Sequence, residues 1–507
     1  MIFGSILFEN GNRTEDAVEP EHFGDLNLDQ IVAAAIAGKE EYDLAPFFRQ
    51  PLHDVDNVIF RHEVMRDLED PRLFAVIKAF ALSMHVMREN LAQLEQRFYE
   101  HQKERWFLDA VTIYGAGVNR LVHDLAAADV RSRGLLAFRE YVREYAESGR
   151  FTSLVNEGRE LETALSAIRY RVVIQGVRVE VRPYTGEGDY TAEVETTFQR
   201  FQQGSVAGFD FKFSDALEMN HIEAQILDGV VHLNRDLFAR LAAYIVTNRD
   251  FRDSTIIAFD REIQFYVSWL DYIARFKKAG LPFCYPRVSG TSKEFQDHDA
   301  FDLALAEKLI RENATPVMND FYLTGHERVL VVSGPNQGGK TTTARTFGQL
   351  HYLGSLGCPV PGTKAQLFLP DRIFTHFERQ EQMTTLRGKL EDDLVRIHGI
   401  LQAATSHSIV IINEIFASTT LRDALFLSKK IAGAIIDLDL LCVWVTFLDE
   451  VASLGPQTVS MVTTVVADNP AQRTFKVLRR PADGLAHAMA IAEKYRLTYD
   501  MIMERIR

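Results

Sequence analysis

One stretch of eight residues has the composition and spacing of a phosphate-binding loop. Residues 334–341 match the pattern G-x-x-x-x-G-K-[ST], whose glycines let backbone N–H groups converge on phosphate oxygens. Lys340 is placed to reach the β- and γ-phosphates of ATP, and the Thr341 hydroxyl to ligate Mg²⁺. The residues expected to bind the nucleotide here are Gly334, Pro335, Asn336, Gln337, Gly338, Gly339, Lys340, Thr341 and Thr342.

The segments on either side of this loop have the character that phosphate binding requires. Residues 328–333 contain the apolar, largely β-branched run 329–332, which predicts a buried strand. Residues 342–350 are predicted to form a helix, whose N-terminus adds partial positive charge beside the phosphates. A glycine-rich turn that binds nothing is the alternative interpretation, and the strand–loop–helix context argues against it.

A second strand must bring polar groups to the metal and to the attacking water. Within residues 408–412, Ser408 is followed by four apolar β-branched residues, and Asn413 and Glu414 come directly after them, as expected of a strand that delivers side chains at its carboxyl end. Glu414 is predicted to orient and polarise the water, with Lys340 as its catalytic partner. A solvated carboxylate at a strand end is the alternative interpretation of Glu414.

Asn413 stands where an Asp normally holds Mg²⁺, and an amide contributes no charge to the metal. Asn413 and Thr341 are therefore the expected protein ligands of a weakened magnesium site. Two interpretations stay open, a slow ATPase and a site that binds ATP tightly and barely turns it over. The slow ATPase is favoured because the phosphate oxygens and Thr341 remain available to the metal.

The composition of the whole chain limits its class. The 507 residues predict about three or four domains. No run of 18 apolar residues occurs, so we expect no membrane span, and the apolar start is too short for a signal peptide. Three widely spaced cysteines fit the reducing cytoplasm. The formal net charge of −14 disfavours a large non-specific grip on DNA, although it allows a local basic surface.

The residue patterns predict five consecutive parts. These are a short N-terminal segment, the first half of a helical module, a small β-containing insertion, the second half of the helical module, and an α/β nucleotide-binding domain. Their expected ranges are 1–24, 25–165, 166–216, 217–300 and 301–507.

A β-hairpin is predicted inside the insertion. Over residues 177–182 valines alternate with charged side chains, which is the period of a half-buried strand, and the β-branched segment 172–174 lies just before it. Arg171, Arg178 and Arg182 belong to the best candidate basic patch for DNA in the sequence. The polar face of an ordinary strand is the alternative interpretation of these arginines.

The loop resembles the form found in the MutS family, T-G-P-N-M-G-G-K-S-T, in its Gly-Pro-Asn opening and its double glycine. Other segments are similar to family motifs: 317–320 to V-P-N-D, 357–361 to G-x-x-V-P-A, 413–415 to D-E-I and 486–492 to S-Y-G-I-x-V-A. The resemblance is strong over about 315–505 and weaker over the helical part before it.

This resemblance implies both a fold and a function. The expected fold is an ABC-like α/β P-loop NTPase domain, preceded by an elongated, mostly α-helical core and lever module that carries a clamp-like β insertion. Asp423 and Thr446 match family residues and are expected in the nucleotide site. ATP and Mg²⁺ are the expected cofactors. A homodimer joined through the nucleotide domains is expected to clamp DNA. The alternative is a nucleotide-gated scaffold for protein partners, which the acidic charge favours.

The sequence departs from the family pattern around the site. Gly388 stands at the position of the signature serine, for which Thr384 or Thr385 could substitute, and Phe447 stands at that of the switch histidine. These changes, with Asn413, put the rate of turnover in doubt and leave nucleotide binding intact. The helical core starts near residue 25, so mismatch-reading and connector domains are not expected, and neither is a nuclease tail. Branched or otherwise unusual DNA is therefore the expected target.

Overall fold

The computed structural model divides into two compact units. The first comprises Met1–Phe74, Asp129–Phe138 and Ala258–Arg507, and the second comprises Ala75–Ala128 and Arg139–Ile257. No helix in the described part of the chain is long and apolar enough to cross a membrane. The described residues are 3–9, 18–96, 99–175, 178–186, 219, 221–378, 388–466, 469–482 and 497–506.

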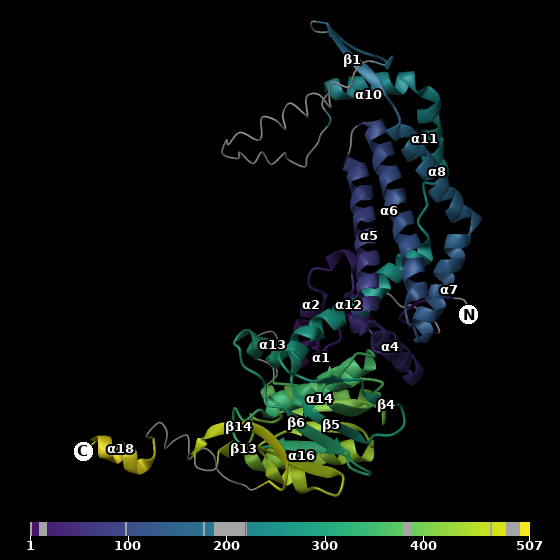
Figure 1. Cartoon of the computed structure of the whole chain (residues 1–507). Helices are drawn as coiled ribbons and strands as arrows, with labels where there is room; N and C mark the ends of the chain where they lie inside the picture. The colour runs from purple at the N-terminus through teal and green to yellow at the C-terminus, as the bar shows by residue number, and fades with distance from the viewer. Residues whose placement is uncertain are drawn as a thin grey trace. The chain divides into compact units, whose positions relative to one another are not determined.

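Helices dominate the second unit. Apolar side chains recur at helical spacing along α6 and bury one face against α8 and α11. Close approach requires small residues, since a Cβ at Gly115 of α6 would lie 2.8 Å from Val155 Cγ2 of α8. All or part of the following helices lie in this unit: α5 (Pro71–Gln96), α6 (Glu100–Ala127), α7 (Arg133–Glu147), α8 (Gly149–Ser166), α10 (His221–Leu233), α11 (Arg235–Thr247) and α12 (Ser254–Lys278) (Figure 1).

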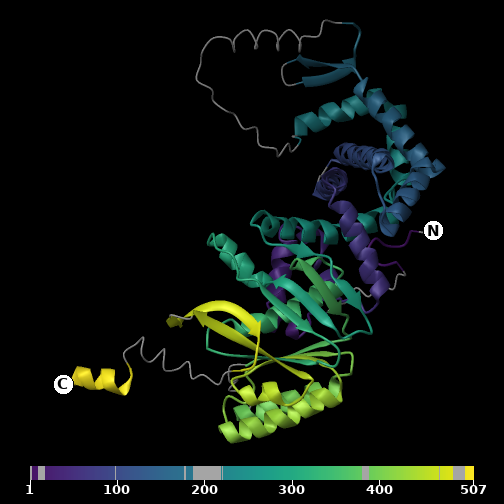
Figure 2. The same cartoon turned by 60° about the horizontal axis from the view of Figure 1, so that its bottom comes forward.

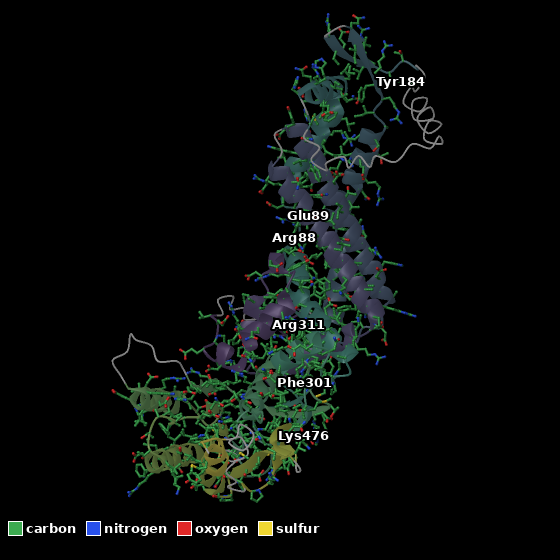
Figure 3. All side chains as sticks on the ribbon, turned by 90° about the vertical axis from the view of Figure 1, so that its left-hand side faces the viewer. Arg88, Glu89, Tyr184, Phe301, Arg311 and Lys476 are labelled. Carbon is green, nitrogen blue, oxygen red and sulfur yellow. The ribbon has the colours of Figure 1, made fainter. Side chains whose placement is uncertain are left out.

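The predicted hairpin is confirmed as β1 (Tyr170–Gln175) paired antiparallel with β2 (Arg178–Pro183). Helix α10 packs on β2, where a Cβ at Gly229 would lie 2.8 Å from Val181. Tyr184 follows β2 at the end of the unit that carries the hairpin (Figure 3). The rest of the expected insertion, from residue 187 to 216, lies outside the described residues.

A six-stranded sheet forms the centre of the first unit and gives it an α/β fold. Its strand order is β10 (Ile373–His376), β11 (Ile409–Asn413), β12 (Leu441–Val445), β7 (Val329–Ser333), β13 (Thr458–Val466) and β14 (Asn469–Arg479). The first five strands are parallel, and β14 pairs antiparallel with β13. Every residue of β7, β11 and β12 is buried, as expected of parallel strands covered on both faces. The strands predicted at 328–333 and 408–412 are thereby confirmed.

Helices cover both faces of this sheet (Figures 1 and 2). Alternate strand residues such as Val331, Ile412 and Trp444 form one core with α15 (Lys389–Ala403) and α16 (Leu421–Asp437). Helix α14 (Lys340–Ser355) contacts β7, β11 and β12, and also β8 and β9 of the smaller sheets. Helix α14 is therefore buried between layers, with its first residue at the phosphate loop.

Smaller elements complete the first unit. One sheet has the order β4 (Arg287–Ser289), β9 (Lys364–Phe368), β5 (Phe295–Ala300) and β6 (Asn319–Leu323), and β3 (Phe283–Cys284) pairs with β8 (Val360–Pro361). The remaining elements are α1 (His22–Leu26), α2 (Leu28–Ile36), η1 (Glu40–Tyr42), α3 (Ala45–Arg49), α4 (Val55–Leu68), α13 (Leu303–Arg311), η2 (Asp449–Ser453) and α18 (Tyr499–Ile506).

The N-terminal helices pack on α14. Arg345 Nε donates to Asp25 O at 2.8 Å, Gln349 Nε2 to Leu26 O at 2.9 Å, and the Tyr352 hydroxyl to Phe48 O at 2.9 Å. The first compact unit groups residues 25–74 and 258–300 with the nucleotide domain. The compact units are defined by packing, whereas the ranges predicted from the sequence follow changes of residue pattern.

Arg61 of α4 holds the C-terminal end of α14. Its side chain is fully buried, and Nη1 donates to Leu356 O at 2.9 Å while Nε donates to Leu7 O at 3.1 Å. The guanidinium also lies 5.0 Å and 4.9 Å from the ring centroids of Phe8 and Phe265. A buried cation is stable only with such partners, so α4, α14 and the N-terminal segment depend on one another here.

We expect Arg61→Met to lower the free energy of unfolding by about 3 kcal/mol, because two buried carbonyl groups lose their donor. Urea unfolding followed by circular dichroism measures this loss. Arg131→Met is the matched control, since the Arg131 side chain is 79% exposed, and should change stability by less than about 0.5 kcal/mol. Equal losses in the two variants would contradict the role given to Arg61.

Candidate nucleotide-binding site

Each glycine of the loop between β7 and α14 stands where a side chain would be disfavoured, either by the backbone conformation or by a close neighbour. Gly334 and Gly339 have φ angles of 117° and 99°, which favour glycine. At Gly338 a Cβ would lie 2.6 Å from Thr463 Oγ1 and 2.9 Å from Pro335 O. Thr463 of β13 therefore packs directly beneath the loop and holds its curvature.

The Lys340 ammonium is enclosed by oxygen atoms of the loop. Nζ donates to Gly334 O at 3.1 Å, Pro335 O at 3.3 Å and Asn336 Oδ1 at 3.2 Å. The residue is 4% exposed, and burial lowers the pKa of Lys340. Phosphate oxygens that enter the loop can replace these acceptors, so the cation is already placed where a triphosphate would bind.

Two further side chains approach Lys340 from neighbouring strands. A carboxylate oxygen of Glu414 lies 3.9 Å from Nζ and acts against the effect of burial on the Lys340 pKa. The Phe447 ring centroid lies 4.3 Å from Nζ, a cation–π distance. The aromatic residue at the expected switch-histidine position therefore contacts the loop lysine directly.

The two residues expected to hold the metal lie side by side. The Thr341 hydroxyl donates to Asn413 Oδ1 at 3.0 Å, so an amide and a hydroxyl oxygen meet at the carboxyl end of β11. No group of three or more His, Cys, Asp or Glu side chains that could hold a metal ion occurs among the described residues. A magnesium ion here would depend on neutral protein oxygens, phosphate and water.

Glu414 is carried into the site by a strained turn. Glu414 and Phe416 have φ angles of 56° and 64°, in the left-handed region that side chains other than glycine rarely adopt. The Glu414 N–H donates to Val445 O at 3.0 Å, which fixes the turn against β12. The carboxylate then lines the same cavity as Lys340 and Thr341.

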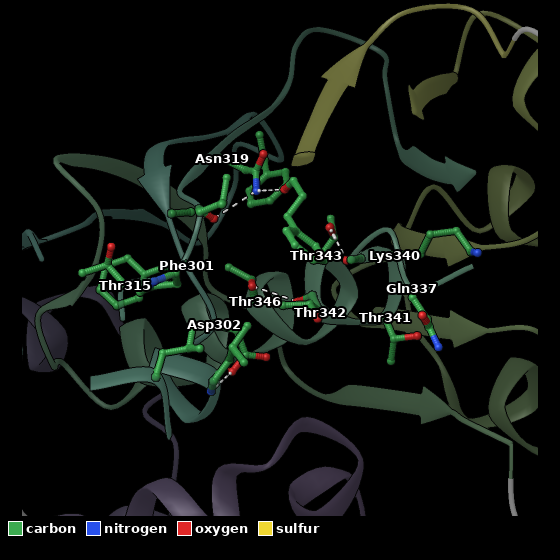
Figure 4. A pocket seen from close by; sticks show the side chains of 18 of the residues that line it. Phe301, Asp302, Thr315, Asn319, Gln337, Lys340, Thr341, Thr342, Thr343 and Thr346 are labelled. Carbon is green, nitrogen blue, oxygen red and sulfur yellow. Dashed lines mark hydrogen bonds between the residues drawn. The ribbon is translucent and has the colours of Figure 1, made fainter. Parts of the chain in front are cut away.

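This cavity has a volume of about 490 Å³ and two chemically different ends. Figure 4 shows Gln337, Lys340 and Thr341 at one side and Phe301 and Thr315 at the other. Beyond the loop the lining is largely apolar, and it includes Leu305, Leu309, Pro316, Val317, Phe321 and Phe475.

The apolar end was not predicted from the sequence. Phe475 of β14 has a φ angle of 58°, and Asn319 Nδ2 donates to its carbonyl at 3.1 Å. Asn319 Oδ1 also accepts from Val477 N at 2.8 Å, so one amide in the cavity lining joins β6 to β14. The motif around Asn319 was the one available signal, and no local pattern marks Phe475.

Thr446 and Asp423, both expected in the nucleotide site, lie outside the loop and outside the cavity lining. Thr446 follows β12, where its N–H donates to Val332 O at 3.1 Å and its hydroxyl accepts from Leu448 N at 3.0 Å. Asp423 lies in the first turn of α16 and exchanges hydrogen bonds with Thr420. Gly388 precedes α15, whereas Thr384 and Thr385 lie outside the described residues.

Known proteins resemble this region. The family model MutS domain V matches residues 330–498. Endonuclease MutS2 of Thermus thermophilus is 31% identical over 195 residues, which are 37% of this chain and 25% of the relative. DNA mismatch repair protein MutS of Zymomonas mobilis is 28% identical over 43% of this chain and 26% of the relative. The protein of that name from Symbiobacterium thermophilum is 30% identical over 42% and 24%. The chain spans about a quarter of these relatives.

We expect Gly338→Ala to weaken ATP binding by at least about tenfold, because the added methyl group collides with Thr463 and with the loop backbone. Titration with a fluorescent ATP analogue measures the affinity. Gly399→Ala on α15 is the matched control, since nothing lies within 4 Å of its Cβ position. Unchanged affinity in Gly338→Ala would mean that the loop does not bind phosphate in this conformation.

Proposed function

We propose that this chain, which belongs to the MutS family through its domain V, is an ATP-binding protein and slow ATPase that dimerises through its nucleotide domains and clamps branched or unusual DNA. The observation that carries the ATP site is the meeting of Lys340, Thr341 and Glu414 in one cavity at the end of two buried strands. The dimer and the DNA target are supported by the family likeness.

The cavity supports a defined mode of ATP binding. The triphosphate would displace Lys340 Nζ from its three loop acceptors. Its oxygens would accept hydrogen bonds from the N–H groups of the loop and of the N-terminus of α14. The base and ribose would occupy the other end, where Leu309, Val317 and Phe475 offer apolar and aromatic surface. This arrangement matches the general form of ligand sites, which combine apolar walls with a few placed polar groups.

Hydrolysis would use the residues around Lys340. Thr341 with Asn413 would hold Mg²⁺, which would supply neutralisation of the negative charge on the phosphates. Once Lys340 turns to the phosphates, the Glu414 carboxylate loses its closest cation and is free to orient and polarise a water. The amide of Asn413 retains the metal less well than a carboxylate, which makes slow turnover the expected behaviour.

The hairpin offers a surface for DNA, but its charge is partly neutralised. Arg178 and Arg182 both pair with Glu180, at 2.8 Å and 2.5 Å. This observation favours the second candidate, a nucleotide-gated scaffold for protein partners, as does the net charge of −14. Family likeness favours DNA, since the relatives are named an endonuclease and DNA mismatch repair proteins.

Asn413→Asp is expected to raise turnover by about tenfold and to lower the Mg²⁺ concentration that gives half-maximal activity, because a carboxylate binds the ion more tightly. Steady-state ATPase assays over a magnesium series measure both quantities, with Lys340→Ala as the inactive reference. Identical magnesium curves for the wild-type protein and Asn413→Asp would show that the ion is already well held.

Gel-shift assays with branched and linear duplexes, with and without ATP, test the DNA proposal. Arg178→Glu should weaken binding and reduce the slope of log K against the logarithm of the salt concentration by about one, as expected for the loss of one phosphate contact. Arg120→Glu on α6 is the matched control, because these two arginine side chains are 76% and 71% exposed. If wild-type protein binds neither duplex at low salt, the DNA proposal fails and the scaffold function gains support.

A further inference from the structure

Asp393 is a buried carboxylate outside the cavity lining. It lies in the second turn of α15 and is 7% exposed. Its Oδ2 accepts from Phe416 N at 3.4 Å, and its Oδ1 lies 3.5 Å from His376 Nε2. Burial of a carboxylate is unfavourable without polar partners, so these two contacts explain why an acidic side chain occupies this position.

The first contact restrains the turn that carries Glu414. This turn has two left-handed residues, Glu414 and Phe416, and such a conformation persists only where its surroundings fix it. Val445 O accepts from Glu414 N on one side, and Asp393 accepts from Phe416 N on the other. The Phe416 side chain is also buried in the core formed with α15 and α16. The turn is therefore held at both ends, one of them by Asp393.

The second contact reaches the end of β10. His376 is the last residue of that strand and is 1% exposed, and burial lowers its pKa to about 4. Neither of its ring nitrogens makes a hydrogen bond among the described residues, and the Asp393 carboxylate lies 3.5 Å from Nε2. One turn further along α15, Arg396 Nη1 donates to Phe377 O at 3.0 Å. Helix α15 thus holds the chain at 376–377 by two side chains.

We propose that Asp393 is a positioning residue that fixes the Glu414 turn against the end of β10, and so sets the place of the carboxylate relative to Lys340. This inference rests on the proposed ATPase function. It gives β10 a part in hydrolysis, because a displacement of residues 376–377 would be transmitted through Asp393 to Phe416 and Glu414. The loop and the apolar end of the cavity lie on other elements, so we expect ATP affinity to depend little on these contacts.

The test compares Asp393→Ala, which removes the acceptor, with Asp393→Asn, whose amide oxygen can still accept from Phe416 N. The adjacent Asp392→Ala on the same helix is the matched control. Four quantities are measured: hydrogen–deuterium exchange of peptides spanning 414–420, the Kd for an ATP analogue, kcat, and the thermal unfolding midpoint. If Asp393→Ala does not fold, Asp393→Leu fills the space without an acceptor and takes its place.

In Asp393→Ala we expect faster exchange over 414–420, a Kd within about twofold of wild type, and a kcat lowered about tenfold. Asp393→Asn should return both the exchange rate over 414–420 and kcat most of the way to their wild-type values. Asp392→Ala should match wild type. Unchanged exchange in Asp393→Ala overturns the proposal, and so does a parallel loss of affinity and thermal stability, which would indicate a purely structural role. If the wild-type protein does not hydrolyse ATP, the ATPase proposal fails separately, while the exchange measurement still decides the role of Asp393.

Discussion

Burial of α14 between two sheets is the constraint on which the rest of the first unit depends. A helix that begins at the phosphate loop and is enclosed on all sides must satisfy its polar groups within the protein. Gln349 does so by bonding Leu303 N and Leu26 O, and glycine at 348 makes room for Leu26 and Ile411. The N-terminal helices, the smaller sheet and the main sheet therefore all contribute to the position of Lys340.

Local pattern was sufficient to predict the elements of the fold that are contiguous in the sequence. The buried strands, the glycine loop and the hairpin each follow from a short run of residues whose period or spacing has one physical interpretation. The apolar end of the cavity could not be found in this way. It combines residues from α13, β6 and β14, and depends on the backbone of Phe475, which takes a conformation that the sequence does not mark.

Long-range contacts of buried charged groups were equally hidden. Arg61 and Asp393 stand in helical segments where a charged side chain ordinarily indicates a solvent-facing position. Their partners are backbone groups far away in the sequence, Leu356 O and Phe416 N, so no spacing rule could connect them. Such residues become visible only when the packing is known, and both contact elements that lead to the candidate nucleotide site.

The charges of the candidate site are compatible with the proposed combination of ATP binding and slow turnover. With Asn413 in place of an acid, Glu414 has no second carboxylate beside it at the end of β11, and the triphosphate meets less negative charge there. The same substitution removes the strongest protein ligand that a magnesium ion could have. Electrostatic repulsion of the nucleotide and retention of the metal therefore decrease together. A site with this balance would fit the proposed function, in which ATP is retained and hydrolysed slowly while the nucleotide state biases the conformation of the protein.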